Sequence, residues 1–364
     1  MADWGVSVYL GGPDVPARLP GYLDEAAARG AREVFTSLHI PEVPLREAAA
    51  QLGDLTAEAG RRGLAVVADI APRALAELGA RPEDLSPLRR LGLAGLRLDY
   101  GFEPETIAAF TRNPEGLRIV LNASTADPEF LARVMAAGAN PERLEACHNY
   151  YPRPETGLSR ESLLRSSRYF KQYGLRVAAF IAGTRAKRGP IGAGLPTLEE
   201  HRYAEPGRAA AELLGTGVVD AVLFGDPWAT PEELARVGEV VAAEGRLLRV
   251  RLVPGLDDFQ RSILLDRPHQ NRPDAAAAVL RSTASRAYAA QGPAIAPFNT
   301  VARPVGAVTI DNQGYLRYSG ELQVALVDLP ADPRVNVVAH VVPEDIPLLP
   351  LIGPGQSFVF RTSV

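Results

Sequence analysis

The chain has 364 residues, of which 46% are hydrophobic and 23% are charged. This composition supports a packed core and excludes a disordered polymer, and the length favours a large domain joined to a smaller one. The formal net charge of -4 provides no basic field for nucleic acid, so recognition of an anion would need a local cluster of arginines.

The single cysteine, Cys147, leaves no partner for an intrachain disulfide and excludes a Cys-based zinc site. No apolar run approaches the roughly 20 residues that span a bilayer, and the N-terminus lacks a basic segment ahead of its apolar residues. These features predict a cytoplasmic protein without membrane association.

From the N-terminus to about residue 245, short β-rich runs alternate with helical stretches rich in Ala, Leu, Arg and Glu. Eight such units predict an α/β fold, a (β/α)8 TIM barrel over residues 1–245. The predicted strands are Val6 to Leu10, Glu33 to Leu38, Ala65 to Ile70, Gly95 to Tyr100, Arg118 to Ala123, Leu144 to Asn149, Arg176 to Ala182 and Ala221 to Gly225.

Side-chain alternation predicts which residues point into the barrel, because the outer faces of the strands must pack apolar residues against helices. This assigns Tyr9 to the lumen in the first strand, and both Arg97 and Asp99 to the lumen in the fourth. Asp69 and Asn122 end the third and fifth strands in an inward register. A polar inner rim is therefore expected.

After residue 245 the pattern changes to short alternating strands separated by Pro, Gly, Asn and Asp turns, with helix signals mainly at residues 273–291. This predicts a smaller all-β domain over residues 246–364. Its stretch from Arg303 to Gly320 is a candidate either to close over the barrel mouth or to form a homodimer contact.

The loop from Cys147 to Ser159, CHNYYPRPETGLS, concentrates polar and aromatic side chains between prolines directly after a strand. Proline lowers the entropy cost of fixing such a loop, which favours a preorganised binding surface over a capped turn.

The loop from Gly183 to Arg202 combines glycines with basic side chains. Barrels often bind phosphate after strands seven and eight, so we expect an anion here rather than only a basic lid.

Chemistry in a (β/α)8 barrel takes place at the C-terminal ends of the strands, where several acids of this chain converge. Paired carboxylates suit glycoside hydrolysis. A divalent metal held by Asp69, Asp99, Asp226 and His148 is the weaker interpretation, since no tight ligand spacing supports it, and no metal or cofactor is predicted. Asp99 and Arg97 also have a purely structural interpretation as an ion pair.

Long stretches of the chain resemble one family. VFTSLHIPE, VVADIAP, LRLDYG, VLNAST, ACHNYYPRPETGLS, RGPIGAGLPTLEEHR, ARPVGAVTIDNQGYLRYSGEL and VVPEDIPLLPLIGPGQSF are similar, in order, to the bacterial 6-phospho-N-acetylmuramidases. The resemblance implies a barrel followed by a cyclophilin-like domain, in a cytoplasmic enzyme of peptidoglycan recycling. The implied substrate is N-acetylmuramic acid 6-phosphate β-1,4-linked to N-acetylglucosamine.

The resemblance also ranks the candidate residues. Asp69 and Asp99 are the expected carboxylate pair, with Asp226 and Glu42 in reserve. The expected sugar contacts are Tyr9, His39, Arg97, Asn122, His148, Asn149, Tyr151, Arg153, Glu155 and Thr156, and the expected phosphate contacts are Arg185, Arg188, Gly189, His201 and Arg202.

The segment Ile191 to Ala193 departs from the family pattern, in which a bulky aromatic residue and an acid often stand at this place. A different phosphorylated disaccharide, or a sugar-phosphate-binding protein without catalysis, therefore remains as an alternative. No nucleic acid partner is expected.

Overall fold

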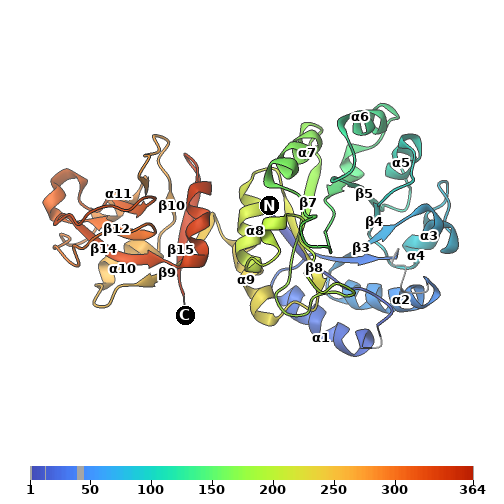
Figure 1. Ribbon diagram of the computed structural model, residues 1–364, viewed down its shortest axis with the longest axis horizontal. Helices are drawn as coiled ribbons and strands as arrows, with labels where there is room; N and C mark the ends of the chain where they lie inside the picture. Colours follow the sequence, from blue (N-terminus) through green and yellow to red (C-terminus); the bar gives the residue numbers. More distant parts are fainter. Residues whose placement is uncertain (1, 13, 39–44, 364) are drawn as a thin grey trace. The chain divides into compact units, whose positions relative to one another are not determined.

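The computed structural model describes residues 2–12, 14–38 and 45–363. Contacts divide the chain into two compact units, Met1–Val241 and Ala242–Val364 (Figure 1). The boundary predicted at residue 245 lies a few residues beyond this division. In the described residues, no helix is both long and apolar enough to cross a membrane.

Eight parallel strands form a closed barrel in which β1 to β8 follow one another in sequence order and β8 pairs with β1. The predicted fold class, an α/β barrel, is confirmed. The strands are β1 (Asp3–Ser7), β2 (Glu33–Ser37), β3 (Ala65–Ile70), β4 (Gly95–Leu98), β5 (Arg118–Asn122), β6 (Leu144–Cys147), β7 (Arg176–Ile181) and β8 (Ala221–Pro227).

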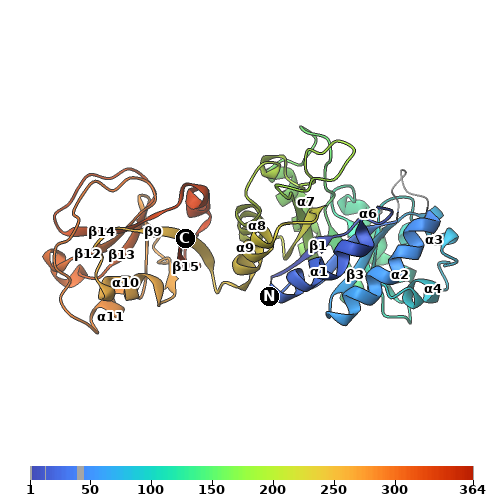
Figure 2. The same ribbon diagram turned by 90° about the horizontal axis from the view of Figure 1, so that it is seen from below.

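Helices surround these strands (Figures 1 and 2). Asp127 begins one of them by accepting a hydrogen bond from the backbone N–H of Phe130 at 2.7 Å, and Gly138 follows its end with a φ of 80°, where a side chain would be strained. The helices are α1 (Val15–Ala28), α2 (Leu45–Arg61), α3 (Pro72–Glu77), α4 (Ser86–Arg90), α5 (Pro104–Thr111), α6 (Pro128–Ala136), α7 (Arg160–Gln172), α8 (Pro206–Gly215) and α9 (Pro231–Ala242), with 3-10 turns η1 (Pro141–Arg143) and η2 (Glu199–His201).

The barrel lumen is filled in layers. At its N-terminal end Arg118 bridges Glu33 and Glu145 at 2.9 and 3.1 Å. Above them lies an apolar layer that includes Phe35 and Phe180, whose rings meet edge to face at 5.1 Å. The core is therefore closed below, and a ligand has access only from the C-terminal end.

The first strand lies earlier than predicted, at Asp3–Ser7 instead of Val6 to Leu10. Its N-terminal half pairs with β8, and the buried Trp4 packs there against Phe224. The inward register is unchanged by this shift, and Tyr9 still belongs to the lumen cluster. Strands β4 and β6 end before Asp99 and His148, which therefore lie in the loops that follow.

The second unit contains a mixed seven-stranded sheet of order β10-β15-β9-β14-β12-β13-β11, in which only β9 and β15 pair in parallel. Helix α10 was not predicted, and within the predicted helical range 273–291 only α11 forms. The elements are β9 (Arg246–Leu252), α10 (Asp258–Leu265), β10 (His269–Gln270), β11 (Val279–Arg281), α11 (Ser285–Ala289), β12 (Ala307–Asp311), η3 (Gln313–Tyr318), β13 (Leu322–Ala325), β14 (Val335–Val341), η4 (Pro343–Leu351) and β15 (Ser357–Thr362).

Candidate active site

Arg97, at the end of β4, is the centre of the polar rim. Only 3% of it is exposed. Its Nη1 donates to Asp69 Oδ1 on β3 at 2.8 Å and lies 3.5 Å from Asp99 Oδ1. Its Nη2 donates to Asn149 Oδ1 at 2.5 Å. One guanidinium thus contacts side chains from the C-terminal ends of β3, β4 and β6.

Asp69 and Asp99 are brought together by this arginine. Because both Oδ1 atoms contact the same Nη1, at 2.8 and 3.5 Å, they lie no further apart than the sum of those distances. Their surroundings differ: the side chain of Asp69 is 10% exposed and that of Asp99 is 26% exposed. Asn122 Nδ2 donates to Asp99 Oδ1 at 3.1 Å. The pair therefore combines a buried, tightly ion-paired carboxylate with a more accessible one.

The charge on Arg97 is fixed by its neighbours. Burial would lower the pKa of this guanidinium, but the negative charge of Asp69 and of its other neighbours raises that pKa above the ordinary value. Arg97 therefore supplies a permanent positive charge in a site from which water is largely excluded, where it acts strongly on developing negative charge.

An aromatic wall lines the barrel lumen. The ring of Tyr150 meets those of Tyr9, Phe35 and Phe180 edge to face, at 6.3, 6.2 and 5.1 Å. The guanidinium of Arg188 lies 4.0 Å above the ring of Tyr9, and its Nη1 donates to the Tyr150 hydroxyl at 3.0 Å. Arg188 is thereby the basic residue of its loop that is held over the barrel lumen.

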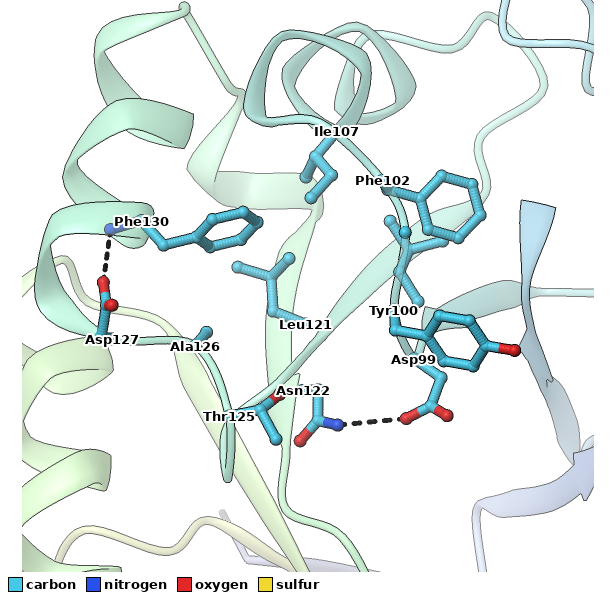
Figure 3. Close-up of a pocket in the computed structure, with 12 residues that line it drawn as sticks. Asp99, Tyr100, Phe102, Ile107, Leu121, Asn122, Thr125, Ala126, Asp127 and Phe130 are labelled. Atoms are coloured by element: carbon cyan, nitrogen blue, oxygen red, sulfur yellow. Dashed lines mark hydrogen bonds between the residues drawn. The ribbon is translucent and has the colours of Figure 1, made fainter.

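An apolar pocket of about 240 Å³ adjoins the acids between the loops that follow β4 and β5. In Figure 3, Asp99 and Asn122 point toward one another at one side of the pocket, while Phe102, Ile107, Leu121 and Phe130 surround its interior. A small alkyl group attached to a polar ligand fits such a combination of surfaces.

The loop from Cys147 to Ser159 is held from below by Glu199 and Arg202. Glu199 accepts the backbone N–H groups of Glu155 and Gly157 at 2.9 and 2.7 Å. Hydrogen bonding to Arg202, followed by these backbone bonds, lowers the pKa of Glu199 to about 2 despite partial burial. The loop backbone is therefore held in place, while its use as a binding surface stays a prediction.

The structure corrects the prediction that Arg202 contacts phosphate. It is 1% exposed, and its donors are used by Glu199 and by the carbonyls of Tyr151, Gly194 and Arg153. It braces two loops and offers no free edge to an anion.

Asp226, a reserve catalytic acid, also has a structural position. It is 1% exposed and accepts the backbone N–H groups of Gly183, Arg188 and Leu195, each at 3.0 Å. Burial raises the pKa of Asp226, although the three backbone hydrogen bonds act to lower it. Asp226 thus shapes the loop after β7, the loop in which the sequence predicted a phosphate site.

Two of the three predicted histidine contacts, His148 and His201, are wholly buried. The ring of His148 lies between Ser124 and Ser167 of α7, at 3.2 and 2.9 Å, on the helix side of β6, and burial lowers its pKa to about 3. His201 contacts Glu212 at 3.1 Å. Neither ring reaches the rim, which corrects both assignments.

In the described part of the chain, one group of His and acidic residues has metal-binding spacing: Glu200, His201 and Glu212. Arg160 donates to both of these glutamates, and Arg208 also donates to Glu212 at 2.8 Å. The carboxylates are thus neutralised by guanidinium groups, so we interpret the group as an ion-pair network.

The remaining candidates lie on the rim or beyond the described ranges. Tyr151 is half-buried at the start of its loop, while Arg153, Glu155, Thr156, Arg185 and Gly189 are exposed. Their assignment stays a prediction. His39 and Glu42 lie outside the described residues.

Sequence reasoning missed Tyr150, Ser124 and Glu199. Tyr150 directly follows Asn149, and strand alternation pointed to Asn149 instead. Because β6 ends at Cys147, alternation no longer applies at these two positions. Nothing in the sequence marks Ser124 as a site residue, yet its hydroxyl accepts a hydrogen bond from the N–H of Asn149 at 2.9 Å. The spacing of Glu199 and Arg202 within one turn was the available sign of a salt bridge.

The fold and the site together define a (β/α)8-barrel protein with a carboxylate pair, an arginine and an aromatic wall at the catalytic end of the barrel. The family model for the N-terminal part of 6-phospho-N-acetylmuramidase matches residues 4–239, and that for its C-terminal part matches residues 246–361. The chain therefore belongs to the 6-phospho-N-acetylmuramidase family, whose name describes a glycosidase.

Two solved structures resemble the whole chain. An uncharacterised Bacillus cereus protein is 32% identical, covers 99% of both chains and has a TM-score of 0.85. A conserved Enterococcus faecalis protein of unknown function is 40% identical, covers 100% of this chain and 97% of its own, and has a TM-score of 0.76. No curated protein matches.

Proposed function

We propose that this protein hydrolyses the β-1,4 bond between N-acetylmuramic acid 6-phosphate and N-acetylglucosamine, in the cytoplasm, during peptidoglycan recycling. The observation that carries the proposal is the contact of Asp69 and Asp99 with one Arg97 nitrogen at the C-terminal ends of β3 and β4. Family membership supplies the reaction class.

Hydrolysis needs a proton for the leaving oxygen and stabilisation of positive charge at the anomeric carbon. In our proposal Asp69, which is ion-paired with Arg97, stays a carboxylate and faces the developing cation. Asp99, the more exposed acid, protonates the leaving oxygen and then takes a proton from water, whose oxygen becomes bonded to the anomeric carbon. Asn122 orients Asp99 through their 3.1 Å hydrogen bond.

The apolar pocket beside Asp99 supports a substrate with an alkyl substituent near the scissile bond. Its interior of Ile107, Leu121 and Phe130 suits the methyl of an acetamido or lactyl group. The carbonyl of such a group would remain near Asn122 at the polar side of the pocket.

Product analysis by mass spectrometry tests the proposal with three disaccharides. The phosphorylated substrate is expected to give its two sugars, the unphosphorylated one to react far more slowly, and a phosphorylated analogue with a free 2-amine to lose most of its rate. Cleavage of another phosphorylated disaccharide but not this one would change the assigned substrate. The departure from the family pattern at Ile191 to Ala193 would then be the reason for the different specificity. Binding without any product would support the non-catalytic alternative.

Arg188 is the residue that we expect to recognise an anionic group of the substrate. Replacing it by Met should reduce kcat/KM for the phosphorylated disaccharide by about 10- to 100-fold, because a charge-assisted hydrogen bond is lost. Arg185→Met is the matched control, since Arg185 is exposed on the same loop. Equal effects of the two variants would show that only the general charge of the loop matters.

A further inference from the structure

The second domain contains a polar pocket of about 320 Å³ on one face of its sheet. Strands β11, β12, β13 and β14 contribute to it, and the turn η3 forms one of its sides. The residues that matter for its chemistry are Val279, Arg281, Arg303, Asp311, Tyr318 and Glu321.

Asp311 and Glu321 lie opposite one another in the antiparallel ladder of β12 and β13. Ile310 pairs with Leu322, and the backbone N–H of Asp311 donates to the carbonyl of Glu321 at 3.0 Å. Both residues are buried, with 5% and 3% exposed. Like charges at directly opposed positions destabilise a sheet, so the arrangement needs a reason other than folding.

Only one of the two acids, Glu321, receives side-chain hydrogen bonds from the described residues. Glu321 accepts from Arg281 Nε and Nη2 at 2.7 and 3.1 Å, and from Gln323 at 3.0 Å. The carboxylate of Asp311 accepts no hydrogen bond from the residues in the described ranges. The side-chain oxygens of Asp311 are not sealed from solvent, so the carboxylate is open to the pocket, where a ligand can supply donors.

Arg303 offers the complementary group. Its Nε donates to the carbonyl of Pro330 at 2.9 Å, and it forms no ion pair within the described residues. Its guanidinium is close enough to Asp311 to lower the pKa of that carboxyl group, although burial dominates and raises the pKa to about 7. The pocket thus holds an acceptor and a donor that the protein leaves for a ligand.

The charges of the pocket restrict what binds there. Asp311 and Glu321 oppose an anion, while Arg281 and Arg303 oppose a cation, so a neutral ligand with adjacent donor and acceptor groups fits best. Val279 and Val335 add an apolar surface, and Tyr318, whose ring already has the guanidinium groups of Arg286 and Arg317 over it, borders the pocket. A sugar with an acetamido group has hydroxyl and N–H donors, a carbonyl acceptor and a methyl group.

We propose that the second domain carries its own binding site for a neutral N-acetylated amino sugar, with Asp311 accepting from the sugar's donors and Arg303 donating to its carbonyl. The sugar class rests on the proposed function, which makes N-acetylglucosamine as a product, whereas the site itself rests on the geometry of the pocket.

The test is a titration of the full-length protein with N-acetylglucosamine, followed through the 13C-methyl signals of Val279 and Val335, which lie in the pocket and not in the barrel. These signals are expected to shift and saturate. Asp311→Asn should weaken binding at least tenfold while leaving the rate of disaccharide hydrolysis unchanged. Asp258→Asn is the control, because Asp258 is exposed in the first turn of α10 and outside the pocket.

Methyl signals that do not move, or an Asp311→Asn variant that binds as well as the native protein, would overturn the proposal. Equal binding of glucose would overturn the assignment to an N-acetylated sugar. Failure of the proposed function appears separately, as absence of hydrolysis, since the titration observes the second domain whether or not the barrel cleaves anything.

Thermal unfolding of Asp311→Asn gives a second, independent readout. A folded pKa of about 7 lies above the ordinary Asp value, so the folded state binds the extra proton and loses stability as pH rises between about 4 and 7. The charged groups acting on Asp311 are Glu321, Asp332, Arg303 and Arg281. The variant should therefore gain Tm relative to the native protein at pH 8 and less at pH 5; an equal change at both would show that Asp311 has donors after all.

Discussion

Asp69→Asn and Asp99→Asn are each expected to lower kcat for the phosphorylated disaccharide by about 10³-fold or more while the protein stays folded. Asparagine keeps the shape of each side chain but removes its charge and its capacity to exchange a proton. The two carboxylates contact one Arg97 nitrogen but differ in exposure, so in our proposal each performs a step that the other does not take over.

The two variants should differ in their response to the leaving group. With an aryl glycoside of N-acetylmuramic acid 6-phosphate, whose leaving phenolate needs no protonation, Asp99→Asn should recover most of its first-step rate and Asp69→Asn should not. The opposite response would exchange the two roles. Asn149→Ala is a useful comparison, since it removes a side chain held by the same arginine without removing an acid.

Retention of full activity by both aspartate variants, with circular dichroism unchanged, would remove this pair from the mechanism. Attention would then turn to acids on the exposed part of the rim, such as Glu155. Asp226→Asn is expected to act differently, by disturbing the loop after β7, because its carboxylate accepts three backbone N–H groups there.

The barrel and the inward placement of Asp69, Arg97 and Asp99 could be predicted from sequence because both follow from local rules, whereas the choice of Asp69 and Asp99 as a catalytic pair came from the family resemblance. Strand periodicity fixes which residues face the lumen, and the parallel arrangement brings the ends of β3 and β4 to one rim. Asp69, Arg97 and Asp99 are placed by these rules alone, which is why a shift of β1 by several residues left the site intact.

The errors arose where the position of a side chain depends on a distant loop. Asp226 was read as a rim acid, but the chain returns from Gly183 to Leu195 to cover it. Arg202 is covered in the same way by carbonyls of the Tyr151 to Arg153 segment. His148 lies just past the end of β6. There, a shift of one position along the chain decides whether a side chain points into the lumen or toward the helices. Sequence periodicity contains no information on such coverage.

The unsatisfied Asp311 was missed for a related reason. Alternation alone shows a polar residue ending a strand, and only the cross-strand register with Glu321 reveals two acids competing for the donors of Arg281. Local sequence rules describe one strand at a time, whereas the cost of a charge depends on its partners across strands.

Replacing Arg97 by Met is expected to destabilise the barrel by about 3–5 kcal/mol, because the buried charge of Asp69 would lose the Arg97 guanidinium that pairs with it. Urea unfolding followed by tryptophan fluorescence measures this effect in the right unit, since both tryptophans, Trp4 and Trp228, belong to the barrel. Arg73→Met is the control: this arginine is 91% exposed and pairs with Glu77, whose side chain is 43% exposed, and its loss should cost less than about 1 kcal/mol.

The double variant Arg97→Met with Asp69→Asn separates folding from chemistry. It removes both charges, so most of the lost stability should return, while hydrolysis should stay as low as in Asp69→Asn alone. A double variant as unstable as Arg97→Met would mean that packing of the arginine, and not its charge, matters. Recovered stability without recovered activity would instead indicate that the buried ion pair is retained for catalysis, at a position where an uncharged pair of similar volume folds as well.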